Sequence, residues 1–431
     1  MINLYKKIEH LLNLDEQRII LMSGIPGSGK STLSKEFEKN GYVVICPDTF
    51  RGIISKGIPG REHWTDAMHE SDQSVSSEAW KMAHEAAKKA VQEGKSIIFD
   101  AMLHTLKARR SLFGVLNKFK VPFYAVYLDV TLETAKERNR KREQDGGRRV
   151  PDFVLKNKWR QQSFPTLNEG FKEVHYISND LEIKPFLSKE ERDSLVNAIV
   201  NDPRKAIEEL KQNGKLKDIF PSLYECWGYA QDNIHHNLPL HEHMITAAEL
   251  IETKDFEMII TMLLHDIGKR KTKEFFAKVK EDNGVFKSGD KVTLLQRFDL
   301  GASFEKIHSN GITTGFLAYD EVEFDVNAHY YDHENVGAIE ARRELLSLGF
   351  DEEFANKVYT NILFHMDLPY KYQGNNQLKK LIKKVGKEQI KKLILIRKAD
   401  KLSGSNNDNV LEEINFIEKC IDEIISKEIK Q

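Results

Sequence analysis

A glycine-rich segment, SGIPGSGKST at residues 23–32, joins an apolar run to a helical stretch. The run RIILMSG (18–24) has the branched apolar side chains of a buried strand. The stretch KSTLSKEFEKN (30–40) has apolar residues at helical spacing. A strand, a tight glycine loop and a helix in this order place backbone N–H groups at a positive helix end, which restricts the fold to a small set of α/β architectures.

The same alternation continues to about residue 180. Four further apolar runs read as strands, namely YVVIC, KSIIFD, PFYAVYLDV and EVHYIS, with helical stretches between them. This pattern predicts a parallel sheet that is covered by helices on both faces. We assign residues 1–180 to this α/β domain.

The remainder of the sequence is predominantly helical. Residues 188–233 read as helices interrupted at Pro203 and Pro221, and we expect residues 181–233 to form a connector or small bridging module. From about residue 234, apolar stripes recur at helical spacing and predict an all-α domain over 234–431. Residues 275–331 are the exception, and their pattern suggests a hairpin or long extended excursion.

Length and composition set further limits. A chain of 431 residues favours two or three domains. No run approaches eighteen apolar residues, and the first residues lack the apolar core of a signal peptide, so we expect no membrane partner and a cytoplasmic location. Cys46, Cys226 and Cys420 lie far apart, which favours reduced thiols over a structural zinc site. A net charge of −1 gives no global argument for nucleic-acid binding.

The glycine-rich segment fits the phosphate-binding pattern G-x-x-x-x-G-K-[ST]. Lys30 would reach the β- and γ-phosphates of ATP, and Ser31 would hold Mg²⁺. The alternative is a glycine-rich turn that binds no nucleotide. The residues expected to bind ATP here are Gly24, Gly27, Ser28, Gly29, Lys30, Ser31 and Thr32.

A phosphate acceptor would meet the residues that follow the next strands. In CPDTFRG, Asp48 and Arg51 emerge at the carboxyl edge of the sheet, and Asp100 closes SIIFD at the same edge. A carboxylate there can accept the proton of an attacking hydroxyl, and an arginine one turn on can bind a phosphate of the acceptor. For Asp48 the alternative is a helix N-cap.

The segment KERNRKREQDGGRR (136–149) is strongly basic, and taken alone it reads as a solvated helix face. Together with GIPGSGKST, CPDTFRG and SIIFDAMLHTLKARR, however, it resembles the phage-type 5′-hydroxyl polynucleotide kinase family over residues 17–165. The resemblance implies that Asp48 is the general base and Arg51 binds the acceptor phosphate. It also implies that Arg138 and Arg142 belong to a lid that contacts the donor phosphates and stabilises the transferring charge.

One departure from that family follows Asp100. The family usually continues this strand with Asp-Thr-Asn or Asp-Ala-Thr, whereas here Ala101, Met102 and Leu103 follow. The missing polar group leaves a related small-molecule kinase open as an alternative.

A second set of motifs lies in the helical region. LLHDIGK places His265 beside Asp266, and imidazole and carboxylate ligands together suit Mn²⁺, Fe²⁺, Co²⁺, Ni²⁺ or Zn²⁺. Such an ion lowers the pKa of its bound water and can therefore supply a hydroxide nucleophile at neutral pH. For an isolated His-Asp pair, the alternative to a metal site is a histidine at a helix end beside an aspartate that caps the helix. The order His243, His265-Asp266 and Asp400 resembles the HD phosphohydrolase superfamily across residues 234–405, and in particular the HD domain of some tRNA nucleotidyltransferases.

This resemblance implies that the four residues of that order are the metal ligands. It also makes four further residues candidates to bind the scissile phosphate or to protonate the leaving oxygen, namely Lys269, His333, His365 and Arg397. Of these, Lys269 and His333 are the expected catalytic residues. His333 and His365 have the alternative of simple helix packing. His235, His236 and His241 would form a second metal position or merely orient a ligand or substrate.

A kinase and a phosphatase acting on one hydroxyl would only consume ATP. Many RNA breaks leave a 5′-hydroxyl and a 2′,3′-cyclic phosphate or 3′-phosphate, so the two sites would mend opposite ends. The architecture resembles bifunctional polynucleotide end-healing enzymes, with RNA or DNA ends as substrates and a separate ligase as partner, since no Lys-x-Asp-Gly motif is present. The alternative is a nucleoside or nucleotide kinase fused to a nucleotide phosphohydrolase. The oligomeric state stays open.

Overall fold

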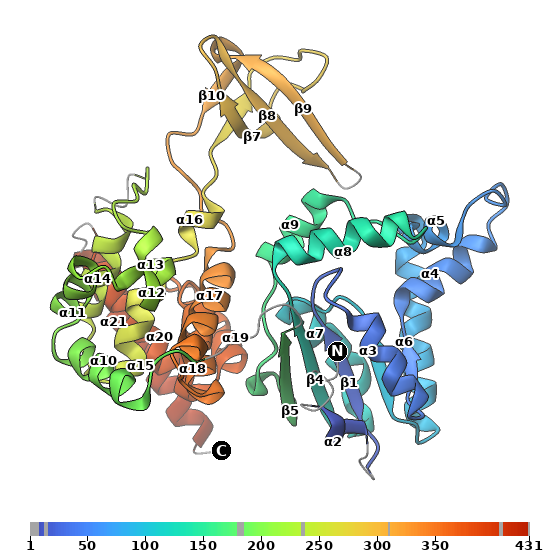
Figure 1. Cartoon of the computed structure of the whole chain (residues 1–431), viewed down its shortest axis with the longest axis horizontal. Helices are drawn as coiled ribbons and strands as arrows, with labels where there is room; N and C mark the ends of the chain where they lie inside the picture. The colour runs from blue at the N-terminus through green and yellow to red at the C-terminus, as the bar shows by residue number, and fades with distance from the viewer. Residues whose placement is uncertain are drawn as a thin grey trace. The chain divides into compact units, whose positions relative to one another are not determined.

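The structure is a computed structural model that describes residues 8–12, 16–178, 185–233, 238–308, 311–404 and 408–429. The chain divides into two compact units, Met1–Ile183 and Lys184–Gln431, and each is described by itself (Figure 1). No helix within the described ranges is both long enough and apolar enough to cross a membrane.

The first unit is built on a five-stranded parallel sheet with the strand order β2-β3-β1-β4-β5, which confirms the predicted parallel sheet (Figure 1). The central strands are buried along their whole length, because helices cover both faces. The strands are β1 (Ile19–Ser23), β2 (Val43–Ile45), β3 (Ile97–Asp100), β4 (Phe123–Asp129) and β5 (Glu173–Ser178).

Alternate residues of β1 point into two separate cores. Ile19 and Leu21 pack with α6 and α7 on one face, whereas Ile20 and Met22 pack with α2 and α3 on the other. This double burial fixes the carboxyl end of β1, from which the glycine-rich loop departs. The helices are α2 (Glu9–Leu12), α3 (Lys30–Lys39), α4 (Pro47–Lys56), α5 (Asp66–Ser71), α6 (Ser76–Gln92), α7 (Leu106–Leu116), α8 (Leu132–Gln144) and α9 (Asp152–Arg160).

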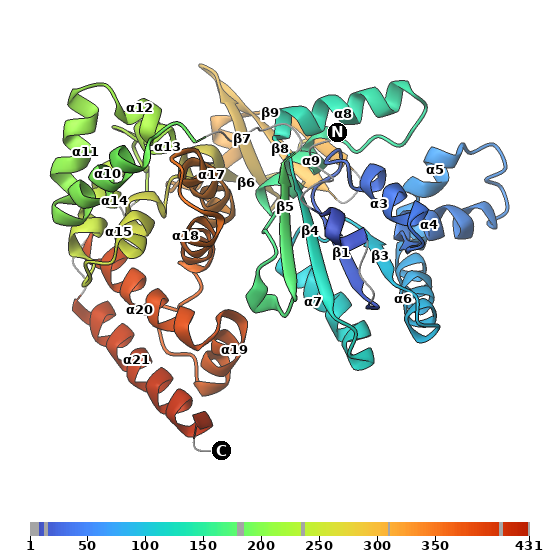
Figure 2. The same cartoon turned by 60° about the horizontal axis from the view of Figure 1, so that its bottom comes forward.

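The second unit is a helical bundle with a strand insertion. Its long C-terminal helices α20 and α21 pack side by side, as do α17 and α18 (Figure 2). The helices are α10 (Lys189–Asn201), α11 (Pro203–Gln212), α12 (Leu216–Ile219), α13 (Pro221–Glu225), α14 (Leu240–Leu250), α15 (Phe256–Leu264), α16 (Lys269–Thr272), α17 (His333–Ser347), α18 (Glu352–Phe364), α19 (Asn375–Val385), α20 (Lys387–Leu402) and α21 (Asp408–Ile429).

The expected bridging module over 181–233 does not form a body of its own within the described residues. Helix α11 packs on α14, and α13 packs on α15 and α17. Ser222 ties this segment to the bundle, because its N–H donates to Glu344 and its hydroxyl accepts from Arg270. The first described part of the helical region is therefore an integral layer of the second unit.

The insertion between α16 and α17 is a five-stranded antiparallel sheet with the order β10-β6-β7-β8-β9, coloured yellow to orange in Figure 1. It encloses its own core of apolar side chains, including Val279, Phe286, Val292, Phe304 and Leu317. The expected hairpin or excursion is therefore a small subdomain. Its strands are β6 (Phe276–Val279), β7 (Lys291–Arg297), β8 (Gly301–His308), β9 (Gly311–Ala318) and β10 (Val322–Phe324).

Candidate functional site

The glycine-rich loop lies between β1 and α3, as the sequence pattern predicts. Gly27 has φ +84°, and a Cβ there would lie 2.7 Å from the carbonyl oxygen of Ala135 in α8, so no larger residue fits. Helix α3 begins without a side-chain cap at Gly29, which leaves its first N–H groups directed at the loop. Ser31 and Thr32 are exposed in this first turn. The arrangement suits an anion.

Lys30 folds back on the loop from which it comes. Its Nζ donates to the carbonyl oxygens of Gly24 at 2.8 Å and Ile25 at 3.0 Å. Burial lowers the pKa of Lys30, and the carboxylates of Asp100 and Asp48 oppose that shift. These two carboxylates therefore lie close enough to the lysine to act on its charge, which brings the loop and the expected acceptor residues into one site.

Asp48 lies between two arginines. It occupies the first turn of α4, one residue after Pro47, and the N-cap position belongs to Cys46, so the N-cap interpretation of Asp48 is wrong. Its Oδ1 accepts from Arg51 at 2.6 Å and its Oδ2 accepts from Arg148 at 2.6 Å. Arg51 is buried and also donates to the carbonyl of Glu70, which fixes its guanidinium.

The basic segment forms α8 and the loop that follows. Arg138 donates to the carbonyl of Gly27 at 3.3 Å, and Arg142 donates to Asn139 at 3.1 Å. The buried Asn139 amide also donates to the carbonyl of Val150 and accepts from its N–H, so the loop closes over the helix end. Burial lowers the pKa of Arg142, and the neighbouring charge of Arg148 adds to that shift. Arg138 therefore contacts the phosphate loop directly, and the charge of Arg142 acts on Lys30.

Two residues of this site were not expected from the sequence. Arg148 lies 100 positions from Asp48, and the sequence placed it only in the basic segment 136–149 and in RRVP, which resembles the end of the lid, without indicating Asp48 as its partner. His104 is buried, and neither of its ring nitrogens has a hydrogen-bond partner among the described residues. It follows Leu103, a non-glycine residue at φ +35°, and burial together with nearby cations lowers the pKa of His104 to about 3. The departure from the family pattern after Asp100 is the only sequence signal for His104.

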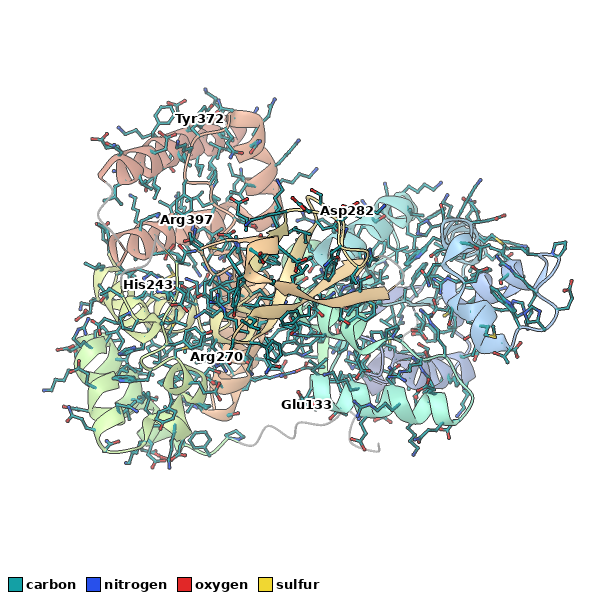
Figure 3. All side chains as sticks on the ribbon, turned by 90° about the horizontal axis from the view of Figure 1, so that it is seen from above. Glu133, His243, Arg270, Asp282, Tyr372 and Arg397 are labelled. Carbon is teal, nitrogen blue, oxygen red and sulfur yellow. The ribbon has the colours of Figure 1, made fainter. Side chains whose placement is uncertain are left out.

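The second unit brings six His and Asp side chains together in its interior. His243 comes from α14, whereas His265 and Asp266 follow the end of α15. His333 opens α17, His365 follows α18, and Asp400 comes from α20. Figure 3 labels His243 and Arg397, which reach this region from different helices. The six residues form two groups of three donors: His243, His265 and Asp400, and Asp266, His333 and His365.

Asp266 bridges the two groups. Its Oδ2 lies 3.3 Å from the Nε2 atoms of both His243 and His265, and its Oδ1 lies 3.2 Å from Nε2 of His333 and 3.7 Å from Nε2 of His365. Asp400 Oδ1 completes the first group at 3.2 Å from His243 and 3.6 Å from His265. A carboxylate with one oxygen in each group can serve two ions at once.

Three of the imidazoles have a fixed tautomer. Their Nδ1 atoms lie 2.8, 2.8 and 2.6 Å from carbonyl oxygens, which can only accept, so the proton sits on Nδ1 in His265, His333 and His365. His243 Nδ1 meets the hydroxyl of Ser403, which itself donates to the carbonyl of Asp400. All four Nε2 atoms thus converge on the carboxylates of Asp266 and Asp400, and in their neutral form they offer the lone pairs that a divalent transition metal could use.

The charges of the cluster agree with this donor set. Burial alone would lower the pKa of His265, but the carboxylates of Asp266 and Asp400 raise it to about 10. Burial alone would raise the pKa of Asp266, yet Lys269 and His265 hold it well below its usual range. Asp266 and Asp400 are therefore ionised, and a cation that binds His265 would replace the proton that these carboxylates hold on it.

The remaining residues expected here differ in their surroundings. Lys269 Nζ contacts Asp266 Oδ2 at 2.6 Å and Gln231 at 2.9 Å, so it lies at the cluster. Arg397 is buried, donates to the carbonyl of Leu368 and the hydroxyl of Tyr370, and lies 3.4 Å from Asp400, so it orients that carboxylate.

The other histidines expected from the sequence lie in different surroundings. His333 and His365 lie beside Asp266 in the second donor group, and both side chains are buried. His241 stacks on Trp227, and among the described residues it belongs to neither donor group. His235 and His236 lie outside the described residues.

Comparisons with known proteins bear on the first unit. Residues 19–164 match a family model described as AAA domain. The bifunctional polynucleotide phosphatase/kinase of Schizosaccharomyces pombe is 25% identical over 175 residues, which are 40% of this chain and 35% of that protein. The L-seryl-tRNA(Sec) kinase of Methanococcus maripaludis is 26% identical over 156 residues, which are 34% of this chain and 53% of that protein.

A solved structure of the Pnkp1/Rnl/Hen1 RNA repair complex aligns with 34% of this chain and 44% of its own, at 18% identity and a TM-score of 0.28. The chain thus spans 35% and 53% of the lengths of the two curated relatives. The family match, the phosphate loop and the parallel sheet together make the first unit an α/β domain of the P-loop kinase type.

Proposed function

We propose that this chain repairs both ends of a broken polynucleotide. The first unit phosphorylates a 5′-hydroxyl end with ATP, and the second removes a 2′,3′-cyclic, 2′- or 3′-phosphate in a metal-dependent reaction. One observation carries the proposal: a P-loop lysine beside an arginine-held aspartate, and Asp266 between four imidazoles, occur in the same chain.

In the kinase reaction, the phosphates of ATP would bind the first turn of α3. Lys30 exchanges the carbonyls of Gly24 and Ile25 for phosphate oxygens. Ser31, exposed in the same turn, would hold Mg²⁺. Arg138 and Arg142 neutralise charge that develops on the transferring group.

The acceptor side would use the three residues around Asp48. Its carboxylate accepts the proton of the 5′-hydroxyl after Arg51 and Arg148, which contact it in this structure, have formed hydrogen bonds with phosphates instead. Arg51, already fixed by the carbonyl of Glu70, binds the first phosphate of the acceptor strand. Asp100 closes the same edge of the sheet.

In the second reaction, the two donor groups would hold two divalent ions, with Mn²⁺, Co²⁺, Ni²⁺, Fe²⁺ or Zn²⁺ as candidates. Ions bound there would polarise a phosphoryl oxygen and activate a water. Lys269 holds the bridging carboxylate of Asp266, and Arg397 orients Asp400. The Nδ1 hydrogen bonds keep the imidazole rings aimed inward.

A specific observation also favours a second candidate. Ala101, Met102 and Leu103 follow Asp100, where a polynucleotide kinase would offer polar side chains to its acceptor. The alternative is a small-molecule kinase fused to a nucleotide phosphohydrolase.

The test uses one RNA oligonucleotide with a 5′-hydroxyl and a 2′,3′-cyclic phosphate. The full chain is incubated with ATP and Mg²⁺, and separately with Mn²⁺, Co²⁺ or Ni²⁺, and both termini are read by mass. We expect a 5′-phosphate to appear and the 3′-terminal phosphate to be lost. Activity on mononucleotides with none on the oligonucleotide would replace the proposal with the small-molecule alternative.

Variants assign each activity to its unit. Lys30→Ala and Asp48→Ala should abolish 5′ phosphorylation and leave 3′ processing intact. His265→Ala and Asp266→Ala should do the reverse. Retention of 3′ processing in Asp266→Ala would exclude the bridging role of this residue.

A further inference from the structure

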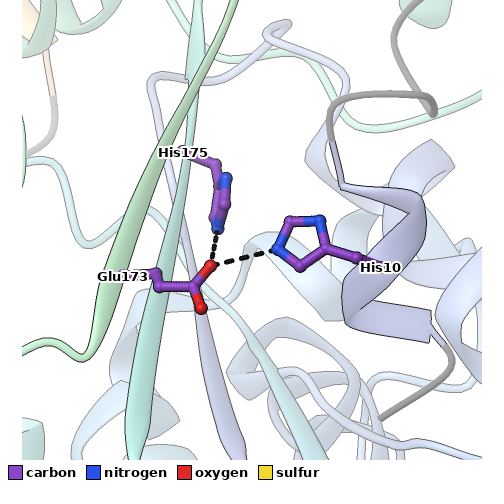
Figure 4. A group of neighbouring side chains, drawn as sticks. All are labelled: His10, Glu173 and His175. Atoms are coloured by element: carbon purple, nitrogen blue, oxygen red, sulfur yellow. Dashed lines mark hydrogen bonds and ion pairs between the residues drawn. The ribbon is translucent and has the colours of Figure 1, made fainter.

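A second His and carboxylate cluster lies in the first unit, away from the phosphate loop. His10 from α2 and His175 from β5 both direct Nε2 at the carboxylate of Glu173, and Figure 4 shows the three side chains converging. Each nitrogen is 3.0 Å from the same oxygen, Oε2. We propose that His10, Glu173 and His175 form a binding site for a divalent cation of the Zn²⁺ type.

The distances fit a single ion. Two ligands that each bond a tetrahedral Zn²⁺ at about 2.1 Å lie roughly 3.4 Å apart. The observed separations from Glu173 Oε2 to the two nitrogens are 3.0 Å, and one ligand atom from each of the three residues lies within 4.8 Å of the others. The two separations from Glu173 therefore need to widen by only about 0.4 Å, and the ligand nitrogens of the two imidazoles already lie within 4.8 Å of each other.

The backbone holds the three residues in place. Glu173 and His175 are two positions apart on β5, so their side chains share one face of the strand. His10 is fixed through its neighbours, because Ile8 and Leu11 are completely buried in the core and the Leu11 carbonyl accepts from Arg18. The site thus joins the edge strand of the sheet to the short helix α2.

The residue types select the class of ion. Two imidazoles and one carboxylate favour Zn²⁺, Ni²⁺, Co²⁺ or Cu²⁺ over Mg²⁺ and Ca²⁺, which prefer oxygen ligands alone. The side chains of His10 and Glu173 are 47% and 40% exposed, so a water or an external group can take the fourth position.

The position indicates what the ion does. Glu173 pairs with Tyr124 near the start of β4, at the amino end of the parallel sheet, whereas the phosphate loop leaves the carboxyl end of β1. The site is therefore separate from the kinase chemistry. It links residues 163 positions apart, so the bound ion clamps α2 onto the sheet.

A neighbouring ion pair supplies the matched control. Lys172 contacts Glu16 at 2.6 Å and lies beside Glu173, with a similar exposure, but it offers no metal ligand near His10. Lys172→Ala removes a contact near the site without removing any of the three donors.

The test measures Zn²⁺ binding to the full chain by equilibrium dialysis and hydrogen exchange of residues 8–12. His10→Ala and His175→Ala should each bind one ion fewer than the parent chain, and Zn²⁺ should slow exchange in residues 8–12 of the parent but not of His175→Ala. Glu173→Gln, which keeps the shape of the side chain, should lose the same ion, and Lys172→Ala should keep it. Unchanged stoichiometry in both histidine variants would overturn the proposal, as would loss of the ion in Lys172→Ala.

Discussion

Gly268 of the HDIGK segment lies where no side chain fits. Its backbone has φ −67° and ψ −21°, which any residue adopts, so an alanine there would ordinarily stabilise the fold by about 0.4–1 kcal/mol. A Cβ at Gly268, however, would lie 2.1 Å from the carbonyl oxygen of His333 and 2.7 Å from the N–H nitrogen of Gly337. Since real Cβ atoms stay beyond 3.0 Å, α16 and α17 must separate by roughly 1 Å in Gly268→Ala.

Two consequences follow from that separation. Overpacking of a close contact costs about 1–3 kcal/mol, so we expect the free energy of unfolding of the helical unit to fall in Gly268→Ala. The substitution also displaces His333. In the parent chain, Nε2 of His333 lies 3.2 Å from Asp266 and 3.3 Å from His365. Metal sites tolerate deviations of only about 0.2 Å, so the affinity of the second donor group for Mn²⁺ should fall with the 3′-processing rate.

The assay compares urea unfolding, Mn²⁺ binding and both end activities in the parent and in Gly268→Ala. Gly114→Ala is the control, because a Cβ on that helical glycine of α7 meets no atom within 4 Å and should be neutral or stabilising. The 5′-phosphorylation activity should be unaffected in both variants. A Gly268→Ala chain that is as stable as the parent and binds Mn²⁺ equally well would refute the steric argument.

Three further predictions concern the other residues of the sites. The pKa of His104 is about 3 in the folded chain against 6.5 for the ordinary side chain, so its stabilising effect is complete above pH 6.5 and is lost as the pH falls towards 3. At pH 5 the free energy of unfolding should be about 2 kcal/mol lower than at pH 7 because of His104. The measurement is urea unfolding at both pH values, and a His104→Leu variant whose free energy of unfolding falls as much as that of the parent would contradict this. Arg148→Ala removes a charged hydrogen bond to Asp48 and should lower kcat/KM for 5′ phosphorylation about 10- to 100-fold without changing 3′ processing, as both rates measured on one oligonucleotide would reveal. Chelation with EDTA should abolish both activities, and titration back should restore the 5′ reaction with Mg²⁺ alone and the 3′ reaction only with a transition metal; recovery of both with Mg²⁺ would argue against imidazole ligation.

Features encoded within one short stretch could be predicted from the sequence. The five parallel strands appear as apolar runs because both faces of each central strand are buried. The residues of the phosphate loop are contiguous, so the sequence alone identifies Lys30 and the glycines around it. Asp48 and Asp100 followed from the rule that ligands meet the carboxyl ends of parallel strands.

The insertion shows where local patterns are insufficient. Its strands carry charged residues such as Lys278 and Glu305 among short apolar stretches, so only a hairpin or excursion was expected. Pairing with one or two neighbouring strands gives each strand hydrogen bonds and apolar contacts that its own sequence does not predict.

Contacts between distant residues were decided by the tertiary structure alone. The sequence predicts that His265, Asp266 and Asp400 lie in one site. Their division into two donor groups depends on helix packing, which brings His333 and His365 to the second oxygen of Asp266. The contact of Asp48 with Arg148 likewise spans 100 positions. Sequence patterns fix the types of side chain and the local backbone, whereas the partner of a charged group is fixed by packing, because a buried charge must be compensated by whichever groups the fold places beside it.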